Sequence, residues 1–354
     1  MPGTGSWGPG RDRSATQKLD VALETLADGV ARLRSGDDWQ RFLALQAALH
    51  AYSPNNVLLI GAQHTQAFAD GSVSSPDPGY VAGFNTWRAL GRSVERGQRG
   101  YMVLAPCRYD RRVAVAADGS ARALDRADVP EDGETLERRR ALSGFRVEHV
   151  FSVHQTSGAE LAEMPRPQLL QGEAPAGLRD AVVGLVERHG FSVSTVPEAG
   201  PIEGANGLTR WDTRAVLVRS DMDDAAVVKT LVHEAAHVLL HASPPGHFLP
   251  RALKEVEAES VAYVVGAAHG MQTDGYSFPY VAAWAGDQGA KAVHAVQGRV
   301  ASAAREIIEA SPAARAQGGR PPGAAAVIAA QARRAESSVA LEGANVPSAG
   351  AAGL

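Results

Sequence analysis

The residues of this chain that are best placed to do chemistry stand in the segment LVHEAAHVLLH, at 231–241. His233 and His237 are four residues apart, so a helix would place both imidazoles on one face, where they could bind one metal ion. Glu234 would then reach a water molecule on that metal. The spacing predicts a hydrolytic zinc site with Glu234 as its catalytic residue.

A catalytic zinc ion needs a third protein ligand. Acidic residues follow the motif in RALKEVEAESVAYVVGAA, at 251–268. In a helix Glu255 and Glu259 would share one face, whereas Glu257 would point roughly the opposite way. We predict that Glu255 is the third metal ligand and that Glu259 orients a ligating histidine. A solvated acidic helix face is the alternative explanation for this pair.

The chemistry expected of such a site is peptide-bond hydrolysis. Bound zinc lowers the pKa of water to about 7 and polarises a carbonyl group. Glu234 would accept the proton of that water and deliver it to the leaving amine. A further donor usually stabilises the tetrahedral intermediate. Four downstream residues are candidates for that donor, and the sequence does not distinguish among them: Tyr263, Tyr276, Tyr280 and His269.

A rigid element must hold the first motif. Apolar residues recur at helical spacing from Val227 to Leu239, which predicts a helix buried against a core. Histidines that make ordinary hydrogen bonds in a buried helix are the alternative to a metal site. A strand edge nearby could hold an extended substrate, and whether 215–219 is that edge is left open. The other predicted elements of this region are a helix at 177–189, a strand at 191–196, a turn-rich loop at 200–207 and a packing helix at 288–310.

The two motifs together resemble those of the ImmA/IrrE-type metallopeptidases. The stretch HEAAHVLLH is followed by E-x-E-A-E-x-V-A, and the resemblance covers about residues 200–285. It implies a zincin-like fold, a zinc cofactor, a protein or peptide substrate, and Glu255 as the ligand in the second motif.

An arginine-rich segment lies far upstream of this site. Residues 84–108 hold five arginines against one acidic residue, with aromatic residues interleaved. Arginine pairs with phosphate and aromatic rings stack on unpaired bases, so this mixture suits a single-stranded DNA binder. A small α+β domain with Trp39, Phe84 and Trp87 in its core is the alternative. The candidate DNA contacts are Trp87, Arg88, Arg92, Arg96 and Arg99.

The same region resembles the N-terminal domain of ArdC-type antirestriction proteins. The shared order is W-x-x-F-L, Y-S-x-x-N, V-A-G-F-x-T-W, L-G-R, V-x-x-G-x-x-G and L-A-P. This resemblance implies a single-stranded DNA-binding domain that is followed by a metallopeptidase domain, and a role in antirestriction or in a mobile element. The local patterns predict two helices broken at 52–56, with Ser53 as a cap and Pro54 in the first turn, and a strand at 101–104.

Composition limits the other possibilities. The net charge of −4 argues against a protein coated by polyanions, so any nucleic-acid contact must come from a local patch. Cys107 is the sole cysteine, which excludes an internal disulfide framework. No apolar run reaches the length of a membrane span, and the N-terminus lacks the apolar core of a signal peptide, so we expect a cytoplasmic protein.

We therefore expect an α+β protein with a small N-terminal nucleic-acid-binding domain and a C-terminal zincin-like metallopeptidase domain. Three functions stay open: a zinc metallopeptidase coupled to DNA binding, a DNA-protecting protein whose zinc centre is structural or inactive, and a regulator that cleaves a repressor. The expected divisions are a disordered 1–15, a DNA-binding domain at 16–108, a charged insertion or linker at 109–143, the peptidase domain at 144–310 and a low-complexity tail at 311–354.

Overall fold

Three helices begin the described part of the chain in this computed structural model. The structure describes residues 13–33, 35–125, 128–161, 172–244, 246–271, 289–311 and 318–333. Helix α2 starts with a capping box in which Ser35 and Asp38 each accept a hydrogen bond from the other's backbone N–H. Helix α3 has Ser53 as its cap and Pro54 in its first turn, as predicted. The helices are α1 (Arg13–Ala31), α2 (Gly36–Ala48) and α3 (Pro54–Ala69).

An antiparallel sheet of order β1-β5-β3-β4 follows, and α3 packs against β3. The side-chain amides of Asn56 and Gln63 exchange hydrogen bonds with the backbone of Leu104 and Met102. These amides satisfy part of a strand edge that would otherwise lack partners. The elements are β1 (Val81–Gly83), α4 (Phe84–Ala89), β2 (Arg92–Val94), β3 (Tyr101–Val115), β4 (Ala121–Ala123), β5 (Thr135–Ser152), the 3₁₀ turn η1 (Val153–Gln155) and β6 (Thr156–Gly158), which pairs with β2.

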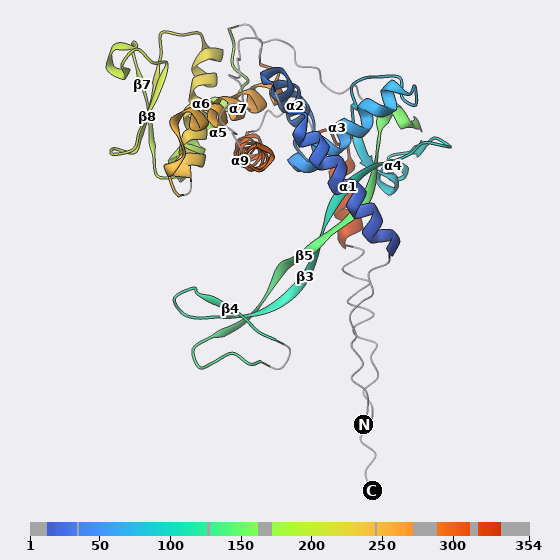
Figure 1. Ribbon diagram of the computed structural model, residues 1–354. Helices are drawn as coiled ribbons and strands as arrows, with labels where there is room; N and C mark the ends of the chain where they lie inside the picture. The colour runs from blue at the N-terminus through green and yellow to red at the C-terminus, as the bar shows by residue number, and fades with distance from the viewer. Residues whose placement is uncertain are drawn as a thin grey trace.

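Strands β3 and β5 form a long hairpin that projects from the body of the molecule (Figure 1). Its ladder runs from Tyr101 opposite Val150 to Val115 opposite Thr135. We call residues 106–145 the arm. The expectation of a linker at 109–143 is corrected, because most of that segment is a paired β-hairpin and a boundary at 144 would divide β5. The expectation of an insertion stays a prediction. Much of the arm is exposed on both faces, so its sequence lacks the alternation of apolar and polar residues that predicts a strand.

The C-terminal half places helices against a three-stranded sheet of order β7-β9-β8. β7 and β9 are parallel, and β8 is antiparallel to β9. The strand predicted at 215–219 is therefore the central strand, and β8 is the edge that runs beside α6. The elements are α5 (Leu178–Arg188), β7 (Ser192–Val196), η2 (Gly200–Ile202), β8 (Gly207–Arg210), β9 (Ala215–Arg219), α6 (Asp224–His241), η3 (Gly246–Phe248), α7 (Arg251–Ala268) and α9 (Gly289–Ala310).

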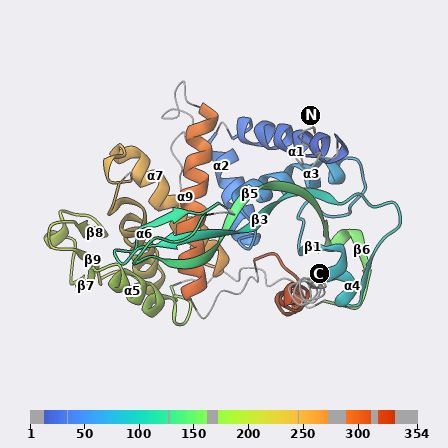
Figure 2. The same cartoon turned by 90° about the horizontal axis from the view of Figure 1, so that it is seen from below.

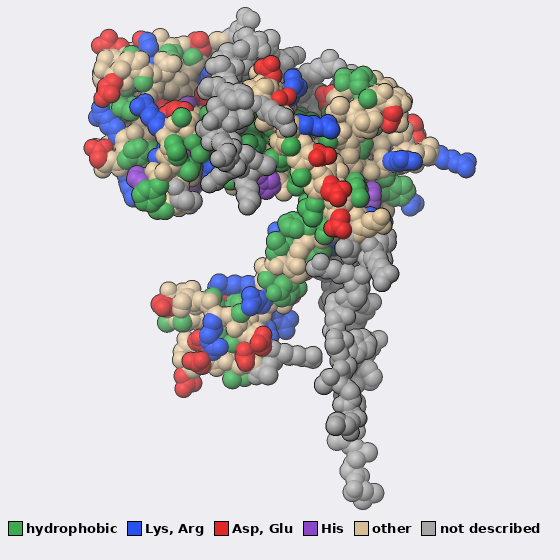
Figure 3. Space-filling model, viewed as in Figure 1, with side chains coloured by type: hydrophobic (Ala, Val, Ile, Leu, Met, Phe, Trp, Pro, Cys, Tyr) green, Lys and Arg blue, Asp and Glu red, His purple; other side chains and the backbone are tan. Residues whose placement is uncertain are grey.

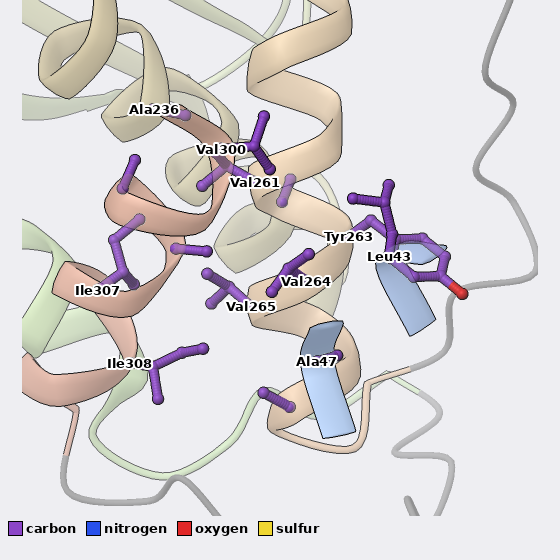
Figure 4. Packing of buried hydrophobic residues seen from close by; sticks show 14 of the residues in the cluster. Leu43, Ala47, Ala236, Val261, Tyr263, Val264, Val265, Val300, Ile307 and Ile308 are labelled. Atoms are coloured by element: carbon purple, nitrogen blue, oxygen red, sulfur yellow. The ribbon is translucent and has the colours of Figure 1, made fainter. Parts of the chain in front are cut away.

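One continuous cluster of buried apolar side chains joins the two halves. Figure 4 shows Leu43 and Ala47 of α2 beside Tyr263 of α7, with Ile307 and Ile308 of α9 at the same cluster. Trp39 Nε1 donates a hydrogen bond of 2.9 Å to Ser260 Oγ within this core. Figure 2 shows α9 between the halves, and it contacts helices of both. The α+β class is confirmed, whereas the two expected domains share a core.

The segment after α9 returns to the N-terminal half. The carbonyl of Gly319 accepts a hydrogen bond of 2.6 Å from Val81 N, and a Cβ added to Gly318 would lie 2.5 Å from Ala51 Cβ. Part of the low-complexity tail expected at 311–354 is thus structured at 318–333, where it includes a helix at 324–333. Of the segment expected to be disordered, 13–15 begin α1 and the rest lies outside the described residues. None of the described helices is both long and apolar enough to cross a membrane.

Candidate metal centre

The two predicted motifs meet where α6 packs against α7. His233 and His237 project from α6 and Glu255 projects from α7, and their potential ligand atoms all lie within 4.8 Å of one another. The two imidazole Nε2 atoms are 3.2 Å apart. Glu255 Oε2 lies 3.4 Å from His233 Nε2 and 3.6 Å from His237 Nε2. The three atoms thus form a nearly equilateral triangle.

The dimensions of this triangle suit a tetrahedral metal ion. Two ligands on a tetrahedral zinc ion, at bonds of about 2.0–2.1 Å, lie about 3.3 Å apart. The three measured separations, 3.2, 3.4 and 3.6 Å, are close to that value. Two imidazoles and one carboxylate are also a donor set used by catalytic zinc sites, which keep a fourth position for water or substrate. The residues present therefore fit a divalent metal ion.

Glu259 holds the first histidine in position. Its Oε2 lies 3.1 Å from His233 Nδ1, and Lys229 Nζ lies 3.6 Å from its other oxygen. Burial lowers the pKa of His233, but hydrogen bonds to Glu255 and Glu259 outweigh that effect and raise it to about 9. Hydrogen bonds with His233 and His237 hold the pKa of the Glu255 carboxyl well below its usual range. A proton can thus occupy His233 where a metal ion would bind.

A buried chain of hydrogen bonds supports the second histidine. His237 Nδ1 lies 3.0 Å from His241 Nδ1, and His241 Nε2 lies 3.0 Å from Glu257 Oε2. The Glu257 carboxylate also accepts a bond of 2.6 Å from Arg299 Nε on α9. His241 and Glu257 are fully buried. Burial lowers the pKa of His241, which favours the neutral ring, whose Nδ1 can accept a hydrogen bond from His237.

These contacts are consistent with a single assignment of protons. If His237 Nδ1 donates to His241, and His241 Nε2 donates to Glu257, then His237 Nε2 carries a free lone pair. If His233 Nδ1 donates to Glu259, then His233 Nε2 also carries a free lone pair. Both lone pairs then face the Glu255 carboxylate, and a cation is the group that such an arrangement binds. The sequence predicted that Glu257 points away from Glu255 and Glu259, but it did not predict the hydrogen bond between Glu257 and His241. No pattern in the sequence indicated that Arg299 would contact Glu257.

Glu234 is held beside the triangle by the edge strand β8. Thr209 Oγ1 donates a hydrogen bond of 2.6 Å to Glu234 Oε2. Among the described residues, no hydrogen bond engages Glu234 Oε1. A Cβ added to Gly207 would lie 2.9 Å from Glu234 Oε1 and 2.7 Å from Thr230 Cγ2, so glycine permits the close approach of β8 to α6. Neither Thr209 nor Gly207 carries a motif by which sequence alone could have found it.

A cavity of about 910 Å³ opens over these groups. Its lining includes His233, His237, Glu234 and Glu255. Apolar side chains and cations complete it, namely Leu208, Trp211, Leu249, Lys229, Arg251 and Lys254. A second cavity, of about 360 Å³, lies between α5, α6 and the sheet, and its lining has Arg179 as its charged residue.

The candidate donors for the tetrahedral intermediate do not line the cavity where the structure describes them. Tyr263 is buried in the shared core. His269 is fully buried, with Nδ1 2.8 Å from the Val265 carbonyl oxygen and Nε2 2.9 Å from Ser311 Oγ. Tyr263 and His269 therefore belong to the packing of the core rather than to the cavity. Tyr276 and Tyr280 lie outside the described residues.

The candidate DNA contacts divide into buried and exposed residues. Trp87 is fully buried and donates a hydrogen bond of 3.0 Å to the Phe151 carbonyl, so its ring cannot stack on a base. Arg92 donates to Thr156 and to the Ala159 carbonyl, and it thereby holds β2 and the segment around β6 together. The prediction is corrected for these two residues. Arg88, Arg96 and Arg99 are exposed, and their predicted role is unchanged.

Comparison with known proteins finds a family match in the N-terminal part of the chain. Residues 19–151 match the N-terminal domain of the anti-restriction factor ArdC. The matched segment spans the arm. The motif residues Asn56 and Gln63, which bond to β3, also lie inside the matched segment.

The solved structures similar to this chain include two of the antirestriction protein ArdC from a plasmid. The metal-free structure is 20% identical with a TM-score of 0.43, covering 73% of this chain and 85% of that one. The Mn(II)-bound structure is 18% identical with a TM-score of 0.37, covering 79% of this chain and 97% of that one.

A relative among curated proteins is an uncharacterized protein of Bacillus anthracis. It is 23% identical over 291 residues, which are 77% of this chain and 47% of that protein. The chain thus spans about half the length of this relative.

Proposed function

We propose that the C-terminal half is a metal-dependent peptidase. The observation that carries this proposal is the convergence of His233, His237 and Glu255 at separations of 3.2, 3.4 and 3.6 Å in a cavity that Glu234 also lines. The same residues form the H-E-x-x-H and E-x-E-A motifs that resemble those of the ImmA/IrrE-type metallopeptidases. The donor set favours zinc, because catalytic zinc sites use two histidines with one glutamate.

His233, His237 and Glu255 would hold the metal ion. When bound, the ion would acidify a water molecule and polarise the substrate carbonyl group. Glu234 would accept a proton at Oε1, because Thr209 occupies Oε2, and would then deliver that proton to the leaving amine. The hydrogen bond from Thr209 limits the rotation of the carboxylate. β8 is a sheet edge beside the cavity, so its backbone could pair with an extended peptide.

The test compares the wild-type protein with a Glu234→Gln variant. Both are loaded with Zn²⁺ or with Mn²⁺ and incubated with fluorescently labelled casein as an unfolded probe. We expect metal binding to persist in Glu234→Gln while hydrolysis falls by about 10²–10⁴-fold, the usual contribution of a general acid–base residue. Full hydrolysis by Glu234→Gln would contradict the proposal. Thr230→Ser, at a residue that lines the cavity from the same helix, is the matched control and should keep its activity.

A second function is supported by a separate observation. We infer that the N-terminal half binds single-stranded DNA, because residues 19–151 match the ArdC N-terminal domain and because the ArdC-type resemblance implies such binding. A role in antirestriction or in a mobile element follows from the same kinship. Affinity for a labelled oligothymidylate should fall as salt rises, because phosphate contacts release counterions. If Glu234→Gln leaves this affinity unchanged, DNA binding and hydrolysis are separate activities. A chain that binds DNA and metal but hydrolyses nothing would favour a DNA-protecting protein with a structural metal centre.

A further inference from the structure

The shaft of the arm concentrates positive charge. Residues 108–112 and 138–142 together contain six arginines and a single acidic residue, Asp110. The register places Arg111 opposite Arg139 and Arg112 opposite Arg138, in two adjacent rungs that project to opposite faces of the hairpin. Side chains that face each other across antiparallel strands lie on the same face, and like charges there oppose folding. The arm therefore carries an arrangement that its own stability does not explain.

Charges elsewhere on the arm neutralise only part of this shaft. Arg139 Nε lies 2.9 Å from Glu137 Oε2, and Arg112 donates to the carbonyls of Asp125 and Asp128. For Arg108, Arg111 and Arg138, the described part of the chain offers no ion pair, and all three are exposed. The acidic residues gather nearer the tip, where Glu134 and Glu131 pair with Arg122. Figure 3 shows basic side chains on the part of the arm nearest the body and acidic ones farther out.

Exposed apolar side chains accompany these arginines. Tyr109 is 47% exposed, Leu142 56% and Phe145 49%. Leu142 lies opposite Arg108 on one face of the hairpin, and Tyr109 lies on the other face, two residues before Arg111. Rings among unpaired guanidinium groups are the combination that binds single-stranded nucleic acid, because guanidinium binds phosphate and the ring stacks on a base. An acidic protein would match the charge but would not need the rings.

We propose that the arm shaft binds the phosphate backbone of a single-stranded nucleic acid that crosses both faces of the hairpin, through Arg108 and Arg138 on one face and Arg111 on the other. This rests on the proposed nucleic-acid binding of the N-terminal half and assigns its surface. Figures 1 and 3 show that open space separates the arm from the C-terminal half, so a strand can reach the shaft from the side. Phosphate between the opposed guanidinium groups would remove their repulsion.

The experiment measures oligothymidylate affinity against salt for the full chain and for two triple variants. The arm variant is Arg108→Gln/Arg111→Gln/Arg138→Gln. The variant used as the control for charge removal is Arg88→Gln/Arg96→Gln/Arg99→Gln, which removes the same charge from the exposed arginines that the sequence predicted as DNA contacts. Three lost phosphate contacts should reduce the slope of log affinity on log salt by about 2, which is about a 50-fold loss at 0.15 M salt. We expect that change in the arm variant and a smaller one in the control.

A third variant separates charge from folding. Arg108→Lys/Arg111→Lys/Arg138→Lys keeps the charge and should retain most of the salt slope. Wild-type affinity with no loss in the arm variant would overturn the proposal while leaving DNA binding intact, as would a larger loss in the control. A wild-type chain that binds no oligothymidylate would overturn the underlying function itself. Tighter, arm-dependent binding of polyglutamate would overturn the assignment in favour of an acidic protein.

Discussion

The metal centre and the arm use charged residues in opposite ways. In the centre, each ligating histidine is hydrogen-bonded on its outer nitrogen, and the buried Glu257 is paired with both His241 and Arg299. On the arm shaft, by contrast, arginine faces arginine on neighbouring strands, and the three exposed arginines proposed to bind phosphate have no ion pair within the described chain. In the centre, other side chains of the protein supply these hydrogen-bond partners, and the Nε2 atoms of His233 and His237 and the Glu255 carboxylate are the groups left to bind a cation. In the arm shaft, Glu137 pairs with Arg139 and backbone carbonyls engage Arg112, and we propose that a phosphate backbone engages Arg108, Arg111 and Arg138.

The difference shows how a site can be located from unmet electrostatic requirements. Convergent lone pairs indicate a cation, and convergent guanidinium groups indicate an anion. Rigidity differs as well, because the centre stands on buried helices whereas the arm shaft is exposed on both faces. We therefore expect substitutions at the centre to change metal affinity and global stability, and substitutions on the arm to change nucleic-acid affinity and local stability.

The largest effect should come from Glu255. Its replacement by alanine removes one of three ligands, and we expect metal content to fall from one ion per chain to nearly none. Glu259→Ala removes an outer carboxylate and should weaken metal binding by about 10–100-fold. Competition with a chromophoric chelator measures both affinities. Equal losses in the two variants would show that Glu255 is not a ligand, and Glu24→Ala on α1 serves as the control.

The next effect concerns the buried ion pair behind His241. Arg299→Met leaves Glu257 with less compensation, and loss of one partner of a buried pair costs on the order of 3 kcal/mol. Urea unfolding of metal-free protein measures this free energy. The double variant Glu257→Gln/Arg299→Met should be more stable than Arg299→Met, because it removes the uncompensated charge. If the double variant is the less stable of the two, the pair does not act as a unit.

The pH dependence of metal-free protein should reveal the proton on His233. Its pKa is raised from 6.5 to about 9 in the folded state, so the folded protein binds this proton more tightly than the unfolded chain. That contribution is complete below pH 6.5 and is lost as pH rises through about 9. Thermal unfolding in excess chelator should therefore show declining stability across this window. His233→Gln should flatten the decline, and an unchanged profile in that variant would assign the effect to another group.

The smallest effect should be local to the arm. Arg111→Thr removes one member of an opposed arginine pair, and cross-strand pairs contribute about 0.2–1 kcal/mol. We expect hydrogen exchange at the amides of β3 and β5 to become slower by a corresponding amount. Arg122→Thr near the tip breaks its contacts with Glu134 and should have the opposite sign. Faster exchange in Arg111→Thr would mean that the opposed arginines do not repel.

Much of the metal centre could be predicted because its spacing is local. His233 and His237 lie on one helix, and helical geometry alone places residues four apart on one face. The same argument separates Glu255 and Glu259 from Glu257. Thr209, Gly207 and Arg299 could not be found in this way, because each meets the site through packing between elements that are distant in the chain.

The N-terminal half shows the limits of reasoning from composition. Trp87 and Arg92 belong to an aromatic and basic stretch, but the fold buries the first and uses the second as a bridge to β6. The strands of the arm could not be predicted from alternating apolar residues, because the side chains on both faces of the shaft are mostly exposed. Residues 318–333 have the composition of a tail, yet Gly318 and Gly319 fit against α2 and β1, where larger residues would collide.

The sequence by itself determined several helices, the Ser53 cap, the α+β class and the three residues that converge at the candidate metal centre, because these depend on periodicity over a few turns. The tertiary structure alone decided that the two halves share a core, that β8 holds the Glu234 carboxylate, and that arginines oppose one another across the arm. Those outcomes depend on register and on contacts between distant segments, which no short-range pattern encodes.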